Sequence, residues 1–133
     1  MTTKSERVEI RSSDDVVRVR QLARTMALAA GLSLVDQTKI ITAASELARN
    51  TLDYGGGGFV LVDLLEALGR RGLRLTFEDR GPGIPDIDAA LKDGFTTGKG
   101  MGLGLGGARR LSNEFSIHSK LGEGTKVVIA RWK

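Results

Sequence analysis

The stretch LRLTFEDRGPGIP, residues 73–85, combines a strand pattern with an abrupt stop. Leu73, Leu75 and Phe77 alternate with polar residues, which predicts a strand with these three side chains on its inner side. Asp79 follows in the same alternation, so its carboxylate is predicted on the side of the strand that faces the core. The glycines and prolines that follow prevent further strand pairing, so the strand ends at this carboxylate.

Asp79 has two readings. It could cap its own turn, because aspartate commonly precedes glycine at the end of a strand. Alternatively, Gly81 and Gly83 leave bare backbone beside a carboxylate that is costly to bury without a hydrogen-bond donor. A buried acceptor beside bare backbone suits an aromatic base that carries an amino group, such as adenine.

The remaining elements follow from periodicity and capping signals. The predicted order is a strand at 7–12, a helix from the N-cap signal at 12–15 to Gly31, a helix from Ser33 to about Asp53, a strand at 59–67 covered on both faces, the strand at 73–79, a short helix near 87–92, a helix at about 105–112, and strands at 114–119 and 125–132. Helices packed on a largely antiparallel sheet predict an α/β sandwich. We expect a single domain over 1–133.

Composition narrows the classes of function. The sequence has no cysteine, which excludes disulfides and thiolate metal sites and favours a cytoplasmic location. No apolar run reaches the length of a membrane span. The net charge of +4 is spread along the chain, and only one Trp, one Tyr and four Phe are present to stack on bases. We therefore expect no membrane and no nucleic-acid partner; a nucleotide phosphate or an acidic protein accounts for the charge equally well.

Glu46 and Asn50 stand four residues apart and so share one face of the predicted helix. The pattern places them nearly opposite the apolar stripe, beside Lys39 and Asp53. A solvated helix face is one reading of these residues. The other uses their chemistry, since an amide oxygen can ligate Mg²⁺ and a carboxylate one turn away can take a hydroxyl proton.

The segment GKGMGLGLGG, residues 98–107, is the most glycine-rich part of the chain. Backbone N–H groups without side chains at a helix N-terminus form an anion site, although a flexible loop remains the alternative. Met101, Leu103 and Leu105 alternate with glycines and would anchor the segment to a core. Two hydroxyls and a cation accompany it: Thr96, Thr97 and Lys99. No Walker lysine motif follows, so the segment is not a P-loop.

Four motifs together resemble the GHKL family of ATP-binding proteins. They are ELARN (46–50), EDRGPGIP (78–85), GKGMGLGLGG (98–107) and GEGT (122–125). The resemblance implies the Bergerat fold, a two-layer α/β sandwich in which a mostly antiparallel sheet packs on helices. It also implies ATP and Mg²⁺ as cofactors, with ATP between the two layers under a lid that we expect at residues 86–100.

The resemblance also assigns roles to individual residues. Asp79 would hold the adenine amino group, Asn50 the Mg²⁺, and Glu46 would act as the catalytic base. Thr125 would support Asp79 through water. Other nucleotide-binding positions lie in the glycine motifs and beside them: Gly81, Gly83, Thr97, Lys99, Gly100, Met101, Gly102, Leu103 and Gly104.

The branch of the family decides the function. The sole histidine, His118, lies on a predicted strand after the first three motifs, whereas a sensor histidine kinase carries its phosphoacceptor upstream of the motifs. The resemblance is to small serine/threonine kinases and anti-sigma factors. It implies a kinase that phosphorylates a STAS-domain partner in a stressosome-type partner switch, with a downstream phosphatase or sigma-regulatory protein. The alternative is an anti-sigma factor that binds a sigma factor directly and is released by an anti-anti-sigma partner.

Overall fold

The computed structural model describes residues 1–91 and 104–133. Its elements are β1 (Thr2–Ile10), α1 (Ser13–Ala29), α2 (Leu34–Asp53), β2 (Gly58–Ala67), β3 (Arg70–Asp79), α3 (Ile87–Ala90), α4 (Gly104–Arg110), β4 (Glu114–Lys120) and β5 (Gly124–Trp132). This is the order and type of elements that the sequence predicts. Among the described residues, no helix is long and apolar enough to cross a membrane.

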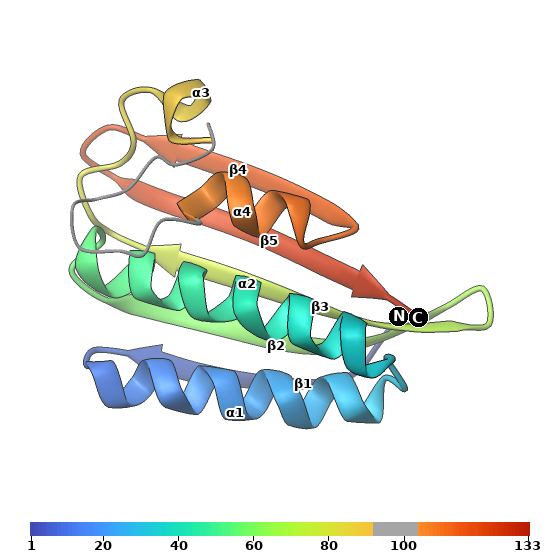
Figure 1. The fold of residues 1–133 in the computed structure, drawn as a ribbon. Coiled ribbons are helices and arrows are strands. Elements are labelled where there is room, and N and C mark those ends of the chain that lie inside the picture. Colours follow the sequence, from blue (N-terminus) through green and yellow to red (C-terminus); the bar gives the residue numbers. More distant parts are fainter. Residues whose placement is uncertain (92–103) are drawn as a thin grey trace.

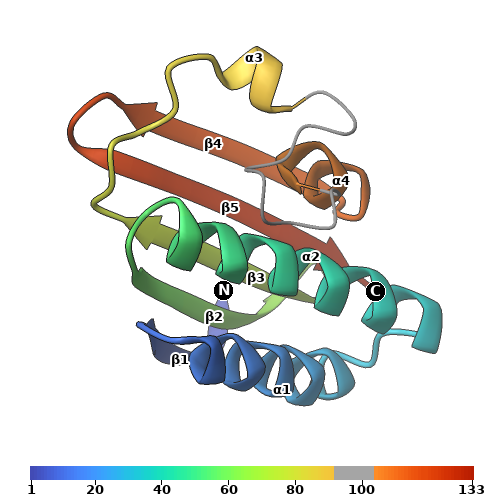
Figure 2. The same ribbon diagram turned by 60° about the vertical axis from the view of Figure 1, so that its left-hand side comes forward.

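The five strands form one sheet in the order β1-β2-β3-β5-β4, and every neighbouring pair is antiparallel. The long helices α1 and α2 lie side by side on one face of this sheet, and α4 lies beside α2 on the same face (Figures 1 and 2). The fold is therefore a two-layer α/β sandwich, as predicted.

The core lies between the helices and the inner face of the sheet. Leu73 and Leu75 are fully buried and Phe77 is 2% exposed, which confirms the alternation of β3. Across the interface, α2 contributes Ile40 and Leu47 to the same cluster. Asp79 therefore lies at the end of a row of core-facing side chains.

The expectation that β2 is covered on both faces holds only in part. Val60 and Val62 are fully buried on the helix side, whereas on the other side Asp63 and Leu65 are buried but Phe59 and Leu61 are only partly buried. A two-layer fold leaves one sheet face without helices. Part of that face is covered by long side chains instead, since the Arg7 guanidinium lies 3.8 Å from the centre of the Phe59 ring.

Strand β1 begins earlier than the predicted strand, at Thr2 rather than residue 7. Its first six residues are exposed, so they carry no alternating apolar signal. The strand instead forms because its backbone pairs with β2 from Thr2 to Ile10 at the edge of the sheet. Backbone pairing without a side-chain pattern is invisible in the sequence.

The predicted helix starts are confirmed by capping interactions. The Ser33 hydroxyl accepts a hydrogen bond of 3.1 Å from the Asp36 N–H at the start of α2. At the start of α1, the Asp15 carboxylate accepts from the backbone N–H groups of Arg11 and Ser12 at 2.8 and 3.2 Å. The bond from Arg11 is the main cause that lowers the pKa of Asp15.

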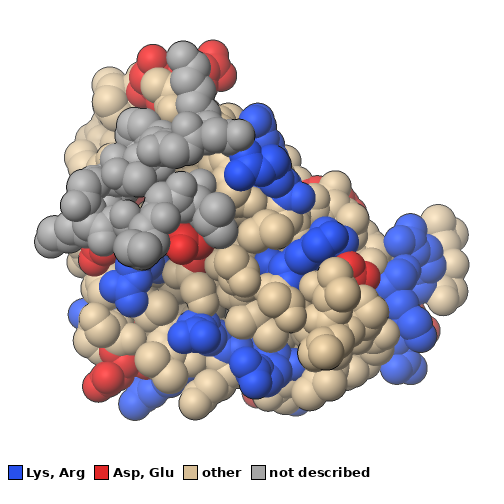
Figure 3. Space-filling view, in the orientation of Figure 1, with Lys and Arg blue, Asp and Glu red and all other residues tan. Residues whose placement is uncertain are grey.

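Basic side chains are spread over the helix face of the molecule rather than gathered in one patch (Figure 3). One of the basic residues is largely withdrawn from solvent and joins both layers. Arg131 on β5 donates to the Asp36 carboxylate of α2 at 2.8 Å and to the Leu111 carbonyl at 3.0 Å. The hydrogen bond from Arg131 is the main cause that lowers the pKa of Asp36. This pair ties the start of α2 to the last strand of the sheet.

We expect Arg131→Leu to lower the free energy of unfolding at neutral pH by about 1 to 2 kcal/mol, because Asp36 loses a charged partner that is 13% exposed. The loss should shrink as the pH falls through the lowered pKa of Asp36, since protonation removes the ion pair from the wild type too. Denaturant unfolding over a pH series measures this. The matched control is Arg18→Leu, whose ion pair with Asp15 has a 70% exposed arginine and should change stability much less than the Arg131 substitution does. Equal losses in both variants would contradict the assignment.

Candidate functional site

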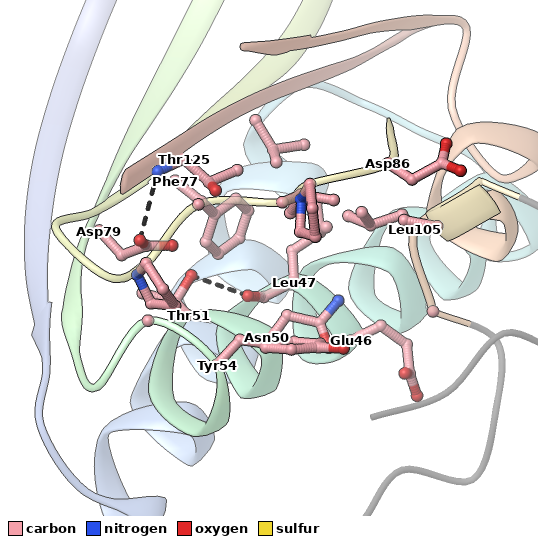
Figure 4. A pocket seen from close by; sticks show the side chains of 18 of the residues that line it. Glu46, Leu47, Asn50, Thr51, Tyr54, Phe77, Asp79, Asp86, Leu105 and Thr125 are labelled. Atoms are coloured by element: carbon pink, nitrogen blue, oxygen red, sulfur yellow. Dashed lines mark hydrogen bonds between the residues drawn. The ribbon is translucent and has the colours of Figure 1, made fainter. Parts of the chain in front are cut away.

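A cavity of about 490 Å³ lies between α2, the end of β3 and the loop that follows it. Figure 4 shows side chains from the helix layer and from the sheet pointing into this space. Its walls are mostly apolar, and its polar groups are few. The lining residues are Glu46, Leu47, Asn50, Thr51, Tyr54, Gly55, Phe77, Asp79, Pro82, Gly83, Ile84, Pro85, Asp86, Ala89, Ala90, Gly104, Leu105, Leu121, Thr125 and Val127. An apolar cavity with a few polar groups is the usual form of a small-molecule site.

Helix α2 supplies one side of the cavity. Glu46 and Asn50 line it together with Leu47, so the prediction that they share one face is confirmed. Since each residue turns the helix by about 100°, Glu46 lies roughly 130° and Asn50 roughly 90° from the centre of the buried stripe of Ala44, Leu47 and Thr51. The expected position nearly opposite the apolar stripe therefore holds approximately for Glu46, whereas Asn50 lies at the edge of the stripe. Both side chains are only partly exposed because they border the cavity.

Asp79 lies at the other side of the cavity, at the end of β3. Its Oδ1 accepts the backbone N–H of Gly81 at 2.9 Å. The same oxygen accepts the backbone N–H of Thr125 at 3.3 Å (Figure 4). No described residue donates to Oδ2. Burial raises the pKa of the Asp79 carboxyl, against the two backbone hydrogen bonds, which lower it. Asp79 therefore caps its own turn through Gly81, as the first reading expects, and it also lines the cavity; its role as an acceptor for a base stays a prediction.

Glycines surround Asp79 because no Cβ fits there. A Cβ on Gly55 would lie 2.4 Å from the Asp79 Cγ, and one on Gly124 would lie 2.1 Å from the Asp79 carbonyl oxygen. A Cβ on Gly81 would lie 2.7 Å from the Gly55 Cα. Position 81 therefore requires a glycine because two loops touch there, and not only because a ligand would lie against bare backbone.

The turn YGGGG, residues 54–58, belongs to none of the motifs described above, and from the sequence it is more readily interpreted as a plain turn than as a site. Gly55 packs against Asp79, and Tyr54 lines the cavity while remaining 45% exposed. The sequence contains a signal for this role, because four glycines directly after a helix with a candidate site are more than a single turn requires. An aromatic ring at the rim of an apolar cavity offers a surface for a planar ligand.

Thr125 contacts Asp79 directly, through its backbone N–H, and the predicted contact through water stays a prediction. Its hydroxyl instead lies 2.9 Å from the hydroxyl of Ser119 on β4. Ser119 was not predicted from the sequence, because a single serine in an alternating strand carries no motif. It also accepts the backbone N–H of Ile84 at 2.7 Å and so joins the cavity wall to the β4–β5 hairpin.

The predicted phosphate-binding segment is described only from Gly104 onward. Gly104 lies at the start of α4 with φ 58, and Gly104 and Leu105 line the cavity. Most of the expected lid at 86–100 lies outside the described residues, and so do several predicted site residues: Thr97, Lys99, Gly100, Met101, Gly102 and Leu103. Residues 86–91 comprise Asp86, the short helix α3 and Leu91, and they adjoin the cavity.

Few of the described side chains that line the cavity could bind a metal ion. In the described part of the chain, no three His, Asp or Glu side chains are grouped to hold a metal ion. A metal bound here would take few protein ligands, and the Asn50 amide oxygen and the Glu46 carboxylate are the hard donors at this end. Such a donor set fits Mg²⁺ that is bound mainly by the phosphates of a ligand.

Comparisons with known proteins agree with this arrangement. A family model described as histidine kinase-, DNA gyrase B-, and HSP90-like ATPase matches residues 35–133. The chain is 46% identical over 125 residues to the serine/threonine-protein kinase RsbT of Bacillus subtilis (strain 168), covering 94% of each sequence. It also resembles the crystal structure of the RsbU and RsbW domains of Rv1364c from Mycobacterium tuberculosis, with a TM-score of 0.67 and 20% identity, over 98% of this chain and 33% of that one. The last likeness concerns the fold alone.

The raised pKa of Asp79 predicts how its replacement changes stability with pH. The folded protein keeps the Asp79 proton at pH values where the unfolded chain, with an ordinary value of 3.8, has lost it. The free energy of unfolding therefore falls as the pH rises through that range. In Asp79→Asn the amide oxygen still accepts from Gly81 and Thr125, but nothing titrates. We expect the stability of the variant relative to the wild type to increase with pH across this range in denaturant unfolding. A difference that is constant or shrinks would show that burial does not control this carboxyl.

Proposed function

Because the chain belongs to the family of histidine kinase-, DNA gyrase B- and HSP90-like ATPases and is a homologue of RsbT, we propose that it is a protein serine/threonine kinase that uses the cavity beside Asp79 to bind ATP. The observation that carries this proposal is the state of Asp79. Two backbone N–H groups fix Oδ1, while Oδ2 accepts nothing from the described residues and stays available as an acceptor.

Oδ2 of Asp79 accepts the exocyclic amino group of adenine. The apolar residues Phe77 and Val127 provide a dry wall for the base, and the Tyr54 ring lies at the rim where it can cover one face. Guanine presents a carbonyl oxygen where adenine has its amino group, so the carboxylate repels it. The cavity volume of about 490 Å³ is in the range of small-molecule sites.

The opposite end of the cavity holds the phosphates. We assign Asn50 to Mg²⁺, through its amide oxygen, and Mg²⁺ when bound neutralises charge on the phosphates during transfer. Glu46, one turn away, receives the proton of the acceptor hydroxyl. The acceptor oxygen forms a bond to the γ-phosphorus while the bond from that phosphorus to the β,γ-bridging oxygen breaks, and ADP leaves with the electron pair.

The partner is a protein that presents a serine or threonine, and we propose a STAS-domain protein within a stress-signalling partner switch. The 46% identity to a protein named as a serine/threonine kinase supports a kinase over the anti-sigma factor. The absence of cysteine from the sequence fits the cytoplasm. His118 is exposed on β4, on the opposite side of that strand from Ser119, so it is poorly placed to receive a phosphoryl group from the cavity.

We expect Asp79→Asn to weaken ATP binding by about tenfold to a hundredfold, because the amide can turn its own donor toward the adenine amino group. Calorimetric titration with Mg·ATP measures this. The matched control is Glu78→Gln, which changes the neighbouring carboxylate outside the cavity and should leave the affinity unchanged. Unchanged affinity in a folded Asp79→Asn variant would place the base elsewhere.

Substitutions of Asn50 and Glu46 on α2 are expected to separate ATP binding from phosphoryl transfer. Asn50→Ala should weaken metal-dependent ATP binding and abolish phosphorylation of a purified STAS-domain partner. Glu46→Gln should bind ATP normally and transfer the phosphoryl group about 10² to 10⁴ times more slowly, since it lacks the base. Asp53→Asn, on the exposed last turn of the same helix, serves as the control.

Labelled γ-phosphate that becomes acid-stable on the partner identifies a serine or threonine ester. If Glu46→Gln transfers the phosphoryl group at the wild-type rate, Glu46 is not the base and is only a solvated residue on α2. An acid-labile phosphate that disappears in His118→Ala would overturn the kinase assignment itself.

A further inference from the structure

The turn between β2 and β3 contains an unusual backbone conformation. Leu68 has φ 54 and Gly69 has φ 76, and positive φ at both positions of a two-residue loop is the pattern of a type I′ turn. Asparagine, aspartate or glycine is preferred at the first position, because the Cβ of other residues lies too close to the following carbonyl oxygen. Within residues 1–91 and 104–133, every other residue with positive φ is a glycine.

Burial does not offset the strain at Leu68, because its side chain is 100% exposed. A single exposed leucine would need no explanation, but here the same residue also strains the backbone. Leu68 therefore lowers the stability of the free protein without a compensating contact among the described residues. A local rule that is broken without such a gain points to a function of the position.

The hairpin presents Leu68 on a stiff support. Strands β2 and β3 stay paired up to Ala67 and Arg70, directly before and after the two turn residues. The neighbouring strands β1 and β5 pair with the hairpin only as far as Leu65 and Gly72. The tip therefore projects from the sheet, as Figure 1 shows at its right-hand side. A preorganised element of this kind loses little conformational entropy when it binds a partner.

Arginines flank the apolar tip. Arg70 and Arg71 follow the turn directly and are exposed, and Figure 3 shows basic side chains on this projecting hairpin. The Arg70 side chain is also oriented, because its Nε donates to the Lys133 carbonyl at 3.1 Å and its guanidinium lies 5.8 Å from the centre of the Trp132 ring. Glu66, opposite Arg71 in the ladder, is the one acidic residue of the segment 66–71. The tip thus has a net positive charge, which complements an acidic surface.

We propose that the tip of the β2–β3 hairpin is a docking element for the protein substrate, with Leu68 in an apolar pocket of that partner and Arg70 and Arg71 on carboxylates at the rim of the pocket. The inference deepens the proposed function and rests on its STAS-domain substrate. An apolar anchor surrounded by polar contacts is the usual composition of a specific protein–protein contact. Since Leu68 does not line the ATP cavity, it contributes to capture of the substrate and not to the transfer step.

A partner of ordinary size is wide enough to extend from the ATP cavity toward the hairpin. Glu46 lies about 18 Å along α2 from Leu34, the first residue of that helix. The hairpin projects beyond this start of α2 (Figure 1). A compact protein of about 100 residues has a radius of gyration of about 13 Å and is therefore about 30 Å across. Such a protein can present a hydroxyl at Glu46 and still cover the start of α2.

The test measures phosphorylation of a purified STAS-domain protein over a range of its concentrations. Leu68→Asn removes the apolar side chain and suits the type I′ turn, so the hairpin should stay folded. We expect the KM for the partner to rise about tenfold, as for the loss of one buried leucine, with kcat and the affinity for Mg·ATP unchanged. Denaturant unfolding should show a higher midpoint for Leu68→Asn, because the strained leucine is gone.

Three further variants complete the experiment. Leu68→Met keeps an apolar side chain and should keep KM near the wild-type value. Val17→Gln removes a 47% exposed apolar side chain from α1 and should not change KM. Arg70→Gln combined with Arg71→Gln should raise KM and weaken its increase with salt concentration, because the charged contacts of the tip are lost.

Calorimetric titration of the STAS-domain protein into the kinase measures docking without transfer, so the possible failures are distinguishable. A wild type that binds this protein without phosphorylating it overturns the proposed function, and the Kd of Leu68→Asn then tests the docking element. A wild type that neither binds nor phosphorylates it overturns both proposals.

An unchanged KM and Kd in Leu68→Asn overturns the docking role and leaves the kinase intact. The other class of partner that suits an apolar tip with arginines is a lipid surface. If the wild type but not Leu68→Asn sediments with phosphatidylglycerol vesicles, while KM is the same in both, the tip binds lipid and the proposal is overturned in favour of a membrane contact.

Discussion

The structure depends on a carboxylate held at the end of a central strand. Asp79 is half-buried, and two backbone N–H groups, from the following turn and from β5, satisfy only one of its oxygens. Three separate segments each place a glycine close to Asp79. A Cβ on Gly55 or Gly124 would collide with Asp79, and a Cβ on Gly81 would collide with the Gly55 turn. The turn after α2, the loop after β3 and the β4–β5 hairpin therefore meet around one acceptor. Their convergence forms one side of the cavity.

The two-layer architecture explains why a cavity forms here. Strands β3 and β5 pair from Gly72 to Glu78, and the register brings Thr125 beside Asp79 where that pairing ends. Helix α2 crosses above this end of the sheet, so its last turns face the carboxylate across a gap that no large side chain fills. The residues with hydrogen-bonding chemistry then lie at the two ends of the gap, and apolar side chains lie between them. A planar, largely apolar ligand that carries polar groups at its ends fits this distribution among the described residues.

The sequence predicted the fold well because its elements obey simple periodic rules. Strand β3 alternates, α2 begins at a hydroxyl cap, and glycines mark the turns. The sequence did not predict the edge strand β1 in full, since backbone pairing needs no side-chain pattern. It also placed Asn50 too far from the core, because a helix that lines a cavity has partly buried positions between its buried side and its solvated side.

The site was predicted only in part, for a similar reason. Asp79, Gly81 and Gly124 stand in motifs, whereas Gly55, Ser119 and Tyr54 gain their roles from neighbours that are distant in the chain. The Ser119 hydroxyl meets Ile84 from another loop, 35 residues away in sequence. Tyr54 acquires a role only when α2 ends beside β3. Such contacts are properties of the packed structure, and a single sequence contains no local trace of them.

The most direct measurement is a crystal structure with Mg²⁺ and a non-hydrolysable ATP analogue. The account predicts the adenine amino group within hydrogen-bond distance of the free Asp79 oxygen and the metal ion on the Asn50 amide oxygen. A nucleotide bound with its base away from Asp79, or a cavity between α2 and β3 that stays empty at saturating analogue, would contradict it.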